Sequence, residues 1–234
     1  VRELARVLTG WTIGPTQTSG FRFAPRLHDN ASKRVLGHSF PASTNSAGEQ
    51  EGINAIHMLA HHSATARRIS LRLAQFFVAD QPSPALVNRL SQSFLDSQGD
   101  ISTVLHTLLA SAEFWASDNR LFKTPMDFAC SALAATQTAT DRRALVLAAD
   151  HLNTAGQPLH GWQTPDGYPF DAATWLAPEA LTRRADFAFA LTRQMPDLAF
   201  LQPYLSEATR HSIAQEKPAL QAGLMLASPD FMAK

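Results

Sequence analysis

Apolar residues recur every three or four positions along most of the chain, which is the period of an amphipathic α-helix. Ile69, Leu73 and Phe76, for example, fall on one face of a helix with this period. The pattern therefore predicts an all-α fold of about nine helices. The segments with helical periodicity are residues 4–11, 49–62, 64–79, 84–97, 101–110, 125–136, 142–152, 179–194, 204–211 and 218–227.

Local signals mark the beginnings of two of these helices. Thr124 precedes Pro125, and Asp127 follows three positions after Thr124, which is the pattern of a capping box with proline at the first helical position. Gly99 is a suitable stop for one helix, and Asp100 is a suitable N-cap for the next. We therefore predict that helices begin directly after Asp100 and Thr124.

Two long segments, residues 12–48 and 156–178, lack the helical period and are interrupted repeatedly by glycine and proline. In the first segment, residues 21–23 and 33–36 alternate in polarity and are predicted to pair as a small β-ribbon. Irregular segments of this length are uncommon in compact domains and are usually functional or disordered. Their aromatic and charged residues favour order, so we interpret both segments as ordered loops that pack together on one side of the helices.

The composition bounds the class of protein. The chain has 234 residues, and we expect a single domain over residues 1–234. Twenty basic and twenty acidic residues cancel, which gives no electrostatic case for a nucleic acid or an anionic membrane as the partner. No apolar stretch approaches the ~20 residues of a membrane span.

Cys130 lies within a helical pattern and is predicted to be a buried core residue. The chain opens at Val1 inside a predicted helix, so we expect a fragment that lacks an N-terminal region.

The first loop carries candidate chemistry at His28, Asp29 and Lys33. In a functional interpretation, His28 is a general base or metal ligand oriented by Asp29, and these two residues are weak candidates for a divalent metal site. In a structural interpretation, Asp29 closes an Asx-type turn, His28 hydrogen bonds to the backbone, and Lys33 pairs with a neighbouring carboxylate. Both interpretations remain open from the sequence, and no cofactor is otherwise expected.

Three histidines follow in the next predicted helix. His57 and His61 are four residues apart on one face, which is a spacing that helices use for paired zinc ligands. The sequence between them lacks the glutamate of the HExxH metalloprotease motif, so that class is excluded. His62 is interpreted as a helix-junction residue that hydrogen bonds to the incoming loop.

Aromatic residues are concentrated in the second loop at Trp162, Tyr168 and Trp175, with Asp166 among them. Such rings stack on a sugar or on an extended peptide, and an aspartate adds directional hydrogen bonds. Alternatively, the aromatic residues only hold the loop against the helices. The nucleophile-elbow, phosphate-loop and dinucleotide-binding motifs are all absent from the sequence.

Together these segments resemble the bacterial DUF1800 family of uncharacterised proteins over essentially the whole chain. The resemblance rests on six stretches in a fixed order: VRELARVLTGW, HDNASKRVLG, LAHHSATARRISLRLAQFFV, LLASAEFWA, KTPMDF and GQPLHGWQTPDGYP. The family pattern falls on Gly10, Trp11, His28, Asp29, Lys33, Gly37, His62, Thr65, Lys123, Pro125, Gly161, Trp162, Pro165, Asp166, Gly167, Trp175 and Arg184. The sequence departs from it at Ser63, where proline is more usual.

The resemblance implies a location and a partner but no activity. Members of the family are commonly expected to be exported from bacterial cells, and they are often encoded beside DUF1501 proteins, which resemble sulfatases or alkaline phosphatases. We therefore expect a binding or assembly module of an exported bacterial protein. Its surface for a protein partner or a glycan would comprise the two loops, with Trp11, His62, Trp162, Asp166, Tyr168, Trp175 and Arg184.

Two alternatives to a binding module remain. One is a metal-dependent hydrolase that uses His28 and Asp29 together with Asp166 or His62. The other is that the loops only brace a missing N-terminal region.

Overall fold

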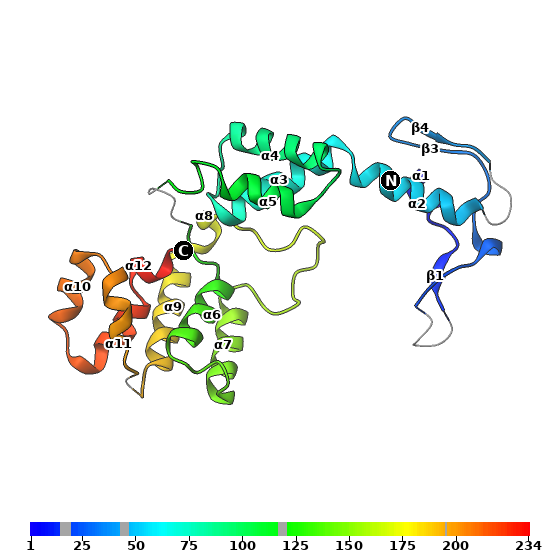
Figure 1. The fold of residues 1–234 in the computed structure, drawn as a ribbon. Coiled ribbons are helices and arrows are strands. Elements are labelled where there is room, and N and C mark those ends of the chain that lie inside the picture. The colour runs from blue at the N-terminus through cyan, green and yellow to red at the C-terminus, as the bar shows by residue number, and fades with distance from the viewer. Residues whose placement is uncertain (15–19, 43–46, 117–120, 195) are drawn as a thin grey trace. The chain divides into compact units, whose positions relative to one another are not determined.

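The computed structural model describes residues 1–14, 20–42, 47–116, 121–194 and 196–234, so residues 15–19 and 43–46 of the first predicted loop lie outside it. The described chain is mostly helical with two small antiparallel sheets, which confirms the predicted fold class (Figure 1). It contains twelve α-helices, more than the expected nine or so, partly because α8 is a single turn inside a segment predicted as irregular and α12 is a single turn after the last predicted helix. The chain divides into two compact units, and the expectation of a single domain stays a prediction.

The first unit comprises Val1–Leu73 and Ser83–Ser111. Within it, α1 packs against β3 and α2, and α4 packs against α5. Val7, Val35 and Ala55 form the small core beneath α1, and Leu90 and Leu108 are buried between α4 and α5. The elements that begin in this unit are α1 (Arg2–Val7), β1 (Trp11–Ile13), β2 (Phe21–Phe23), the 3₁₀ helix η1 (Pro25–Leu27), β3 (Lys33–Val35), β4 (His38–Phe40), α2 (Ala47–Ala60), α3 (Ser63–Phe77), α4 (Pro84–Asp96) and α5 (Ile101–Leu109).

The predicted strands are present, but the predicted pairing between them is wrong. Residues 21–23 pair with β1, where Trp11 lies opposite Phe23, and β3 pairs with β4. The reason lies in the residues after Val35: Leu36 and Gly37 both adopt positive φ angles, of 47° and 86°. Two such residues form the tight turn that suits a two-residue hairpin, so the chain reverses at once and β3 receives its partner from the following residues.

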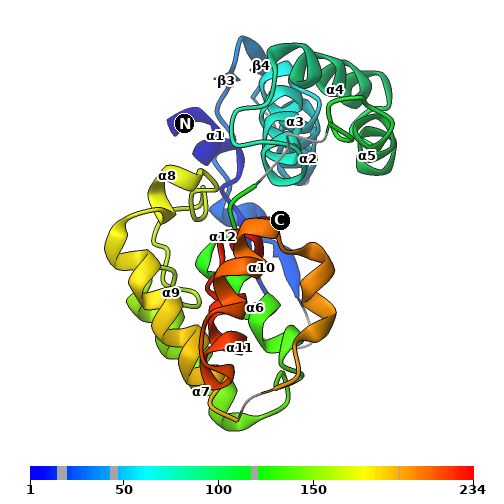
Figure 2. The ribbon, with the colours of Figure 1, turned by 90° about the vertical axis from the view of Figure 1, so that its left-hand side faces the viewer.

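The second unit comprises Ala74–Pro82 and Ala112–Lys234, and α9 packs against α6, α7 and α11 (Figure 2). Its core is centred on Phe128, Phe187, Leu226 and Phe231. The elements of this unit are α6 (Pro125–Ala135), α7 (Arg142–Thr154), α8 (Ala172–Trp175), α9 (Pro178–Leu191), the 3₁₀ helix η2 (Ala199–Tyr204), α10 (Glu207–Ala214), α11 (Pro218–Leu226) and α12 (Pro229–Met232).

Both helix starts predicted from local signals are confirmed. The Thr124 hydroxyl accepts from the Asp127 backbone N–H at 3.2 Å, and the Asp127 carboxylate accepts from the Thr124 N–H at 3.2 Å. Asp100 caps α5 by accepting from the Thr103 N–H at 2.9 Å. In contrast, Cys130 is exposed on α6, so its predicted burial is wrong. The apolar period places it near the core, but Phe128 and Ala129 occupy the buried face of the helix.

None of the helices in the described part of the chain has the length and apolarity that a membrane crossing requires.

Candidate functional site

Lys33 and His28 meet a carboxylate from α2 in the interior of the first unit. Lys33 donates hydrogen bonds from Nζ to both carboxylate oxygens of Glu51, at 2.9 Å to Oε1 and 2.8 Å to Oε2. The His28 ring lies against the same carboxylate, with Nε2 3.1 Å from Oε2. Lys33 is 3% exposed and Glu51 7% exposed, so their ion pair is withdrawn from water.

The other side of the His28 ring is bound to the end of α1. Its Nδ1 lies 2.8 Å from the carbonyl oxygen of Thr9, to which it donates because a carbonyl oxygen only accepts. Its Nε2 lies 3.4 Å from Lys33 Nζ as well as near Glu51. Both ring nitrogens of His28 therefore have partners within the chain.

Asp29 points to different partners from those of its neighbour. Its Oδ1 accepts from the Ala31 backbone N–H at 3.0 Å, which is the Asx-type turn of the structural interpretation. Its Oδ2 accepts from Arg6 Nε at 2.7 Å, and this hydrogen bond lowers the pKa of Asp29 to about 2 and raises that of Arg6. The Thr9 hydroxyl accepts from the Asp29 backbone N–H at 2.8 Å.

Two glycines of α2 allow the helix to approach this cluster. A Cβ atom at Gly48 would lie 2.4 Å from Cδ2 of His28, and one at Gly52 would lie 2.4 Å from Cζ2 of Trp11. These positions, four residues apart, lie on the same face of α2 as Glu51. Trp11 Nε1 is buried without a hydrogen-bond partner among the described residues.

The arrangement explains both how the first segment is held and what sequence reasoning missed. Glu51 joins His28 to Lys33, and it belongs to no recognisable sequence motif. A usable signal was the spacing of Gly48, Glu51 and Gly52, which marks one face of a helix with small residues and a lone carboxylate. Within the described residues, no group of three or more histidine, cysteine or acidic side chains forms a metal-ligand cluster. The catalytic roles considered for His28, Asp29 and Lys33 stay predictions.

The second irregular segment presents an aromatic pair in the second unit. Trp162 and Tyr168 have ring centroids 4.8 Å apart at an interplanar angle of 49°. Trp162 Nε1 donates to Asp166 Oδ1 at 3.0 Å, and the Thr164 hydroxyl donates to the same oxygen. The Tyr168 hydroxyl donates to the Pro158 carbonyl oxygen at 2.6 Å. Trp162 nevertheless remains 42% exposed, so a fixed indole ring is presented to solvent.

Trp175 and Arg184 lie in the interior of the second unit. Trp175, in the single turn α8, donates from Nε1 to the Pro169 carbonyl oxygen at 3.1 Å. Arg184, in α9, donates from Nη2 to the Lys123 carbonyl oxygen at 2.7 Å and lies over the Phe122 ring at 4.5 Å. Burial lowers the pKa of Arg184 to about 10. Their contacts are with the chain itself, and their predicted binding roles stay predictions.

The three histidines in the last turn of α2 and directly after it differ in their contacts. His62 Nδ1 accepts from the Ala64 backbone N–H at 3.1 Å, so His62 caps the start of α3, as its interpretation as a junction residue requires. His57 lies in α2 and His61 directly follows the end of this helix; both are exposed, and their rings are stacked with 6.2 Å between centroids.

The two irregular segments belong to different compact units, and the expectation that they pack together stays a prediction.

Comparison with known families adds one match. A family model described as "Protein of unknown function (DUF1800)" matches residues 1–233, essentially the whole chain. No curated protein and no solved structure matches the chain.

Proposed function

We propose that this chain, which belongs to the DUF1800 family, is a binding or assembly module of an exported bacterial protein. In this proposal, Trp162 contacts the partner. The observation that carries the proposal is the fixed but exposed indole ring, held by Asp166 and packed on Tyr168. A ring that is ordered before binding loses little conformational entropy when a partner covers it. Tryptophan is also among the residues that contribute most to binding at protein interfaces.

The surroundings of Trp162 favour a protein partner over a glycan. Leu159, three residues earlier in the chain, is 58% exposed and adds a second exposed apolar side chain to this segment. Recognition of a sugar requires polar groups next to the stacked ring to hydrogen bond its hydroxyl groups. Here Asp166 Oδ1 and the Tyr168 hydroxyl already hydrogen bond within the chain, so they are less suited to bind a sugar. A glycan ligand is the other outcome of the test below.

The first segment supports the proposal by a different route. Lys33 of this segment is paired with Glu51 inside the unit, while the apolar residues Ile13, Phe21 and Leu36 of the hairpins are exposed. Exposed apolar side chains on short hairpins suit contact with another protein. Trp11 and His62 have structural contacts in this unit, and their binding roles are part of the proposal.

The test uses site-specific photo-crosslinking in the producing bacterium. A crosslinking amino acid at Leu159 is expected to capture a protein, and the resemblance suggests a DUF1501-type neighbour as the first candidate. Trp162→Ala should reduce that capture at least about tenfold, since the loss of a central interface tryptophan costs more than ~2 kcal/mol. Trp115→Ala is the matched control, because Trp115 is also an exposed tryptophan of the second unit.

Three results decide the matter. Capture that depends on Trp162 and not on Trp115 supports the proposal. Binding to an array of bacterial-envelope oligosaccharides, lost in Trp162→Ala, would replace the protein partner by a glycan. Capture or binding that both variants retain would refute a role for Trp162. Fractionation of the producing cells tests export separately.

A further inference from the structure

The outward face of α7 is more apolar than the exposed face of a helix usually is. Leu145, Val146 and Leu147 follow one another in the middle of this helix and are 46%, 53% and 37% exposed. The opposite face, which carries Ala144 and Ala148, is buried in the core of the second unit. A surface helix normally places polar residues away from the core, so a run of three exposed apolar residues indicates a binding surface.

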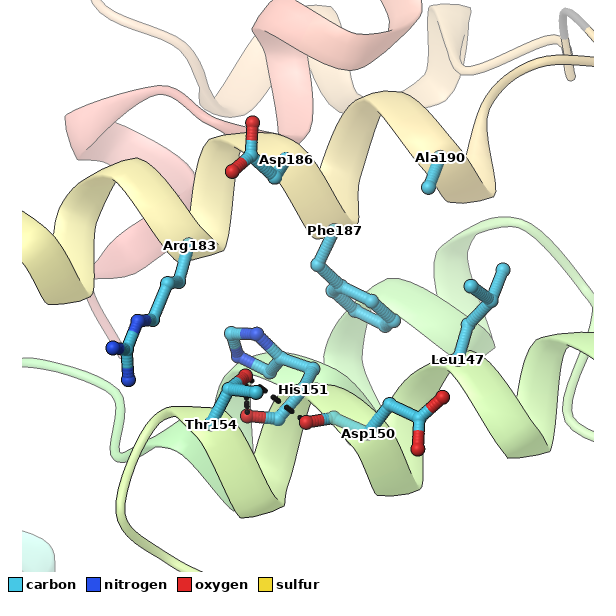
Figure 3. Close-up of a pocket in the computed structure, with 8 residues that line it drawn as sticks. All are labelled: Leu147, Asp150, His151, Thr154, Arg183, Asp186, Phe187 and Ala190. Atoms are coloured by element: carbon cyan, nitrogen blue, oxygen red, sulfur yellow. Dashed lines mark hydrogen bonds between the residues drawn. The ribbon is translucent and has the colours of Figure 1, made fainter.

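The edge of this apolar face borders a pocket between α7 and α9. The pocket has a volume of about 370 Å³, and Leu147 and Ala190 lie at one end of it, with Arg183 at the other end (Figure 3). His151 also lines the pocket, but it is only 4% exposed, and its ring stacks on Phe187 with 4.7 Å between centroids. The end of the pocket next to Leu147 can therefore receive an aliphatic side chain from a second molecule.

Charges of opposite sign flank the apolar run at equal distances. Arg142 lies four residues before Val146 and Asp150 lies four residues after it, so the three side chains share one face of α7. Each charged residue is about 6 Å from Val146 along the helix axis, at 1.5 Å per residue. Both are exposed, and neither has an ion-pair partner among the described residues.

This order of charges makes the face complementary to itself. If a two-fold axis passes at Val146 and two copies of α7 run antiparallel, Arg142 of each copy lies level with the partner's Asp150. Leu145 then lies level with the partner's Leu147, and the same ion pair forms twice. A parallel arrangement would instead bring like charges together. A two-fold interface requires a patch of this self-complementary kind, because the same residues are used by both copies.

We propose that α7 forms the interface of a two-fold symmetric homodimer of this chain, with the two helices antiparallel and Val146 at the axis. The short side chain of Val146 lets the helix axes approach to the distance of packed helices, about 8–10 Å. One helix from each copy buries less than the ~1,200 Å² of a standard interface, so we expect a dimer that exchanges with the monomer at micromolar concentration. The proposal does not require the contact made by Trp162.

Sedimentation velocity on the whole chain tests the association, over protein concentrations from about 1 to 300 µM. We expect the fraction of dimer to rise with concentration. Val146→Glu places two carboxylates against each other at the axis and should raise the dissociation constant at least about tenfold, or ~1.4 kcal/mol. Leu220→Glu is the matched control, because it charges an exposed apolar position of α11 and should leave the dissociation constant unchanged.

Exchange of the two charges tests the antiparallel register. Arg142→Asp alone makes both contacts acidic and Asp150→Arg alone makes both basic, so each variant should dimerise at least about tenfold more weakly than the parent. The double variant Arg142→Asp/Asp150→Arg has the net charge of the parent and should dimerise as the parent does, because each contact again joins unlike charges. If the two positions do not meet across the interface, the double variant will not recover.

The results separate the proposal from its alternatives. A parent chain that stays monomeric over the whole range overturns the homodimer and leaves a different protein as the occupant of α7. A dimer that Val146→Glu leaves intact, or a double variant no stronger than the single variants, overturns the assignment to α7. Circular dichroism checks the fold of each variant, and if Val146→Glu misfolds, the charge exchange decides.

Discussion

The buried ion pair between Lys33 and Glu51 allows a quantitative test of how the first irregular segment is held. Lys33→Met removes the cation but keeps a side chain of similar length, so the Glu51 carboxylate stays buried with only His28 beside it. Breaking a buried pair in this way costs about 3–5 kcal/mol, because the remaining charge is left without its partner in a poorly solvated place. Lys33 and Glu51 are 3% and 7% exposed and their closest atoms are 2.8 Å apart, so solvent screening reduces this cost little.

The double variant Lys33→Met/Glu51→Leu separates the charge from the packing. Both charges are then absent, and apolar side chains of similar volume occupy their places, which is often neutral for stability. His28 Nε2 loses both polar neighbours, at a cost of about 1–3 kcal/mol. We therefore expect the double variant to be more stable than Lys33→Met alone, although each substitution removes a native contact.

Urea unfolding measures these free energies, and hydrogen–deuterium exchange of the peptides over residues 25–60 assigns the change to the first unit. Exchange is needed because a chain of two compact units can unfold in more than one step. Lys217→Met, at an exposed position, is the matched control and should change stability by less than about 0.5 kcal/mol. The reasoning would be refuted if Lys33→Met changed the free energy of unfolding no more than this control does. It would also be refuted if the loss of stability in the double variant equalled the sum of the losses in Lys33→Met and Glu51→Leu measured separately.

Two further predictions concern His151 and Gly48. The pKa of His151 is lowered from 6.5 to about 4 in the folded state, so the unfolded state binds the proton first and stability falls as the pH is lowered through this window. The expected loss in the free energy of unfolding is about 3 kcal/mol. Urea titrations of the parent at pH 7 and pH 4 should show this loss. An equal loss in His151→Phe would contradict its assignment to the protonation of His151. At Gly48, alanine would ordinarily stabilise a helix by ~1 kcal/mol, but its Cβ would lie 2.4 Å from the His28 ring. We therefore expect Gly48→Ala to destabilise the protein by about 1–3 kcal/mol, and a higher melting temperature would show that the close approach is not needed.

Local signals were sufficient for the main helices, for the helix caps and for the turn at Asp29. The helical period located the main helices, and the capping box at Thr124 is formed by residues only three positions apart. The Asx turn at Asp29 and the helix cap at His62 likewise use partners two residues away. Such hydrogen bonds form in short peptides as well as in folded proteins, so the residue types alone predict them.

The pairing of strands and the burial of single side chains were beyond the same reasoning. Two strands were predicted correctly, but their partners were not, because alternation shows that a segment is extended and leaves its neighbour open. Cys130 was assigned to the core from a pattern that is ambiguous by one position on a helix.

The chain by itself determined its helices, their caps and its family. Only the tertiary structure decided that Glu51 joins Lys33 and His28 from 18 and 23 residues away. The structure alone also showed that His151 lines a pocket with Nε2 lacking a partner among the described residues. The physical reason is that burial and ion pairing depend on which surfaces come together when α2 covers the first segment and α9 covers α7. Which surfaces pack together depends on the packing of the whole unit. It therefore cannot be predicted from composition or from the spacing of residues along the chain.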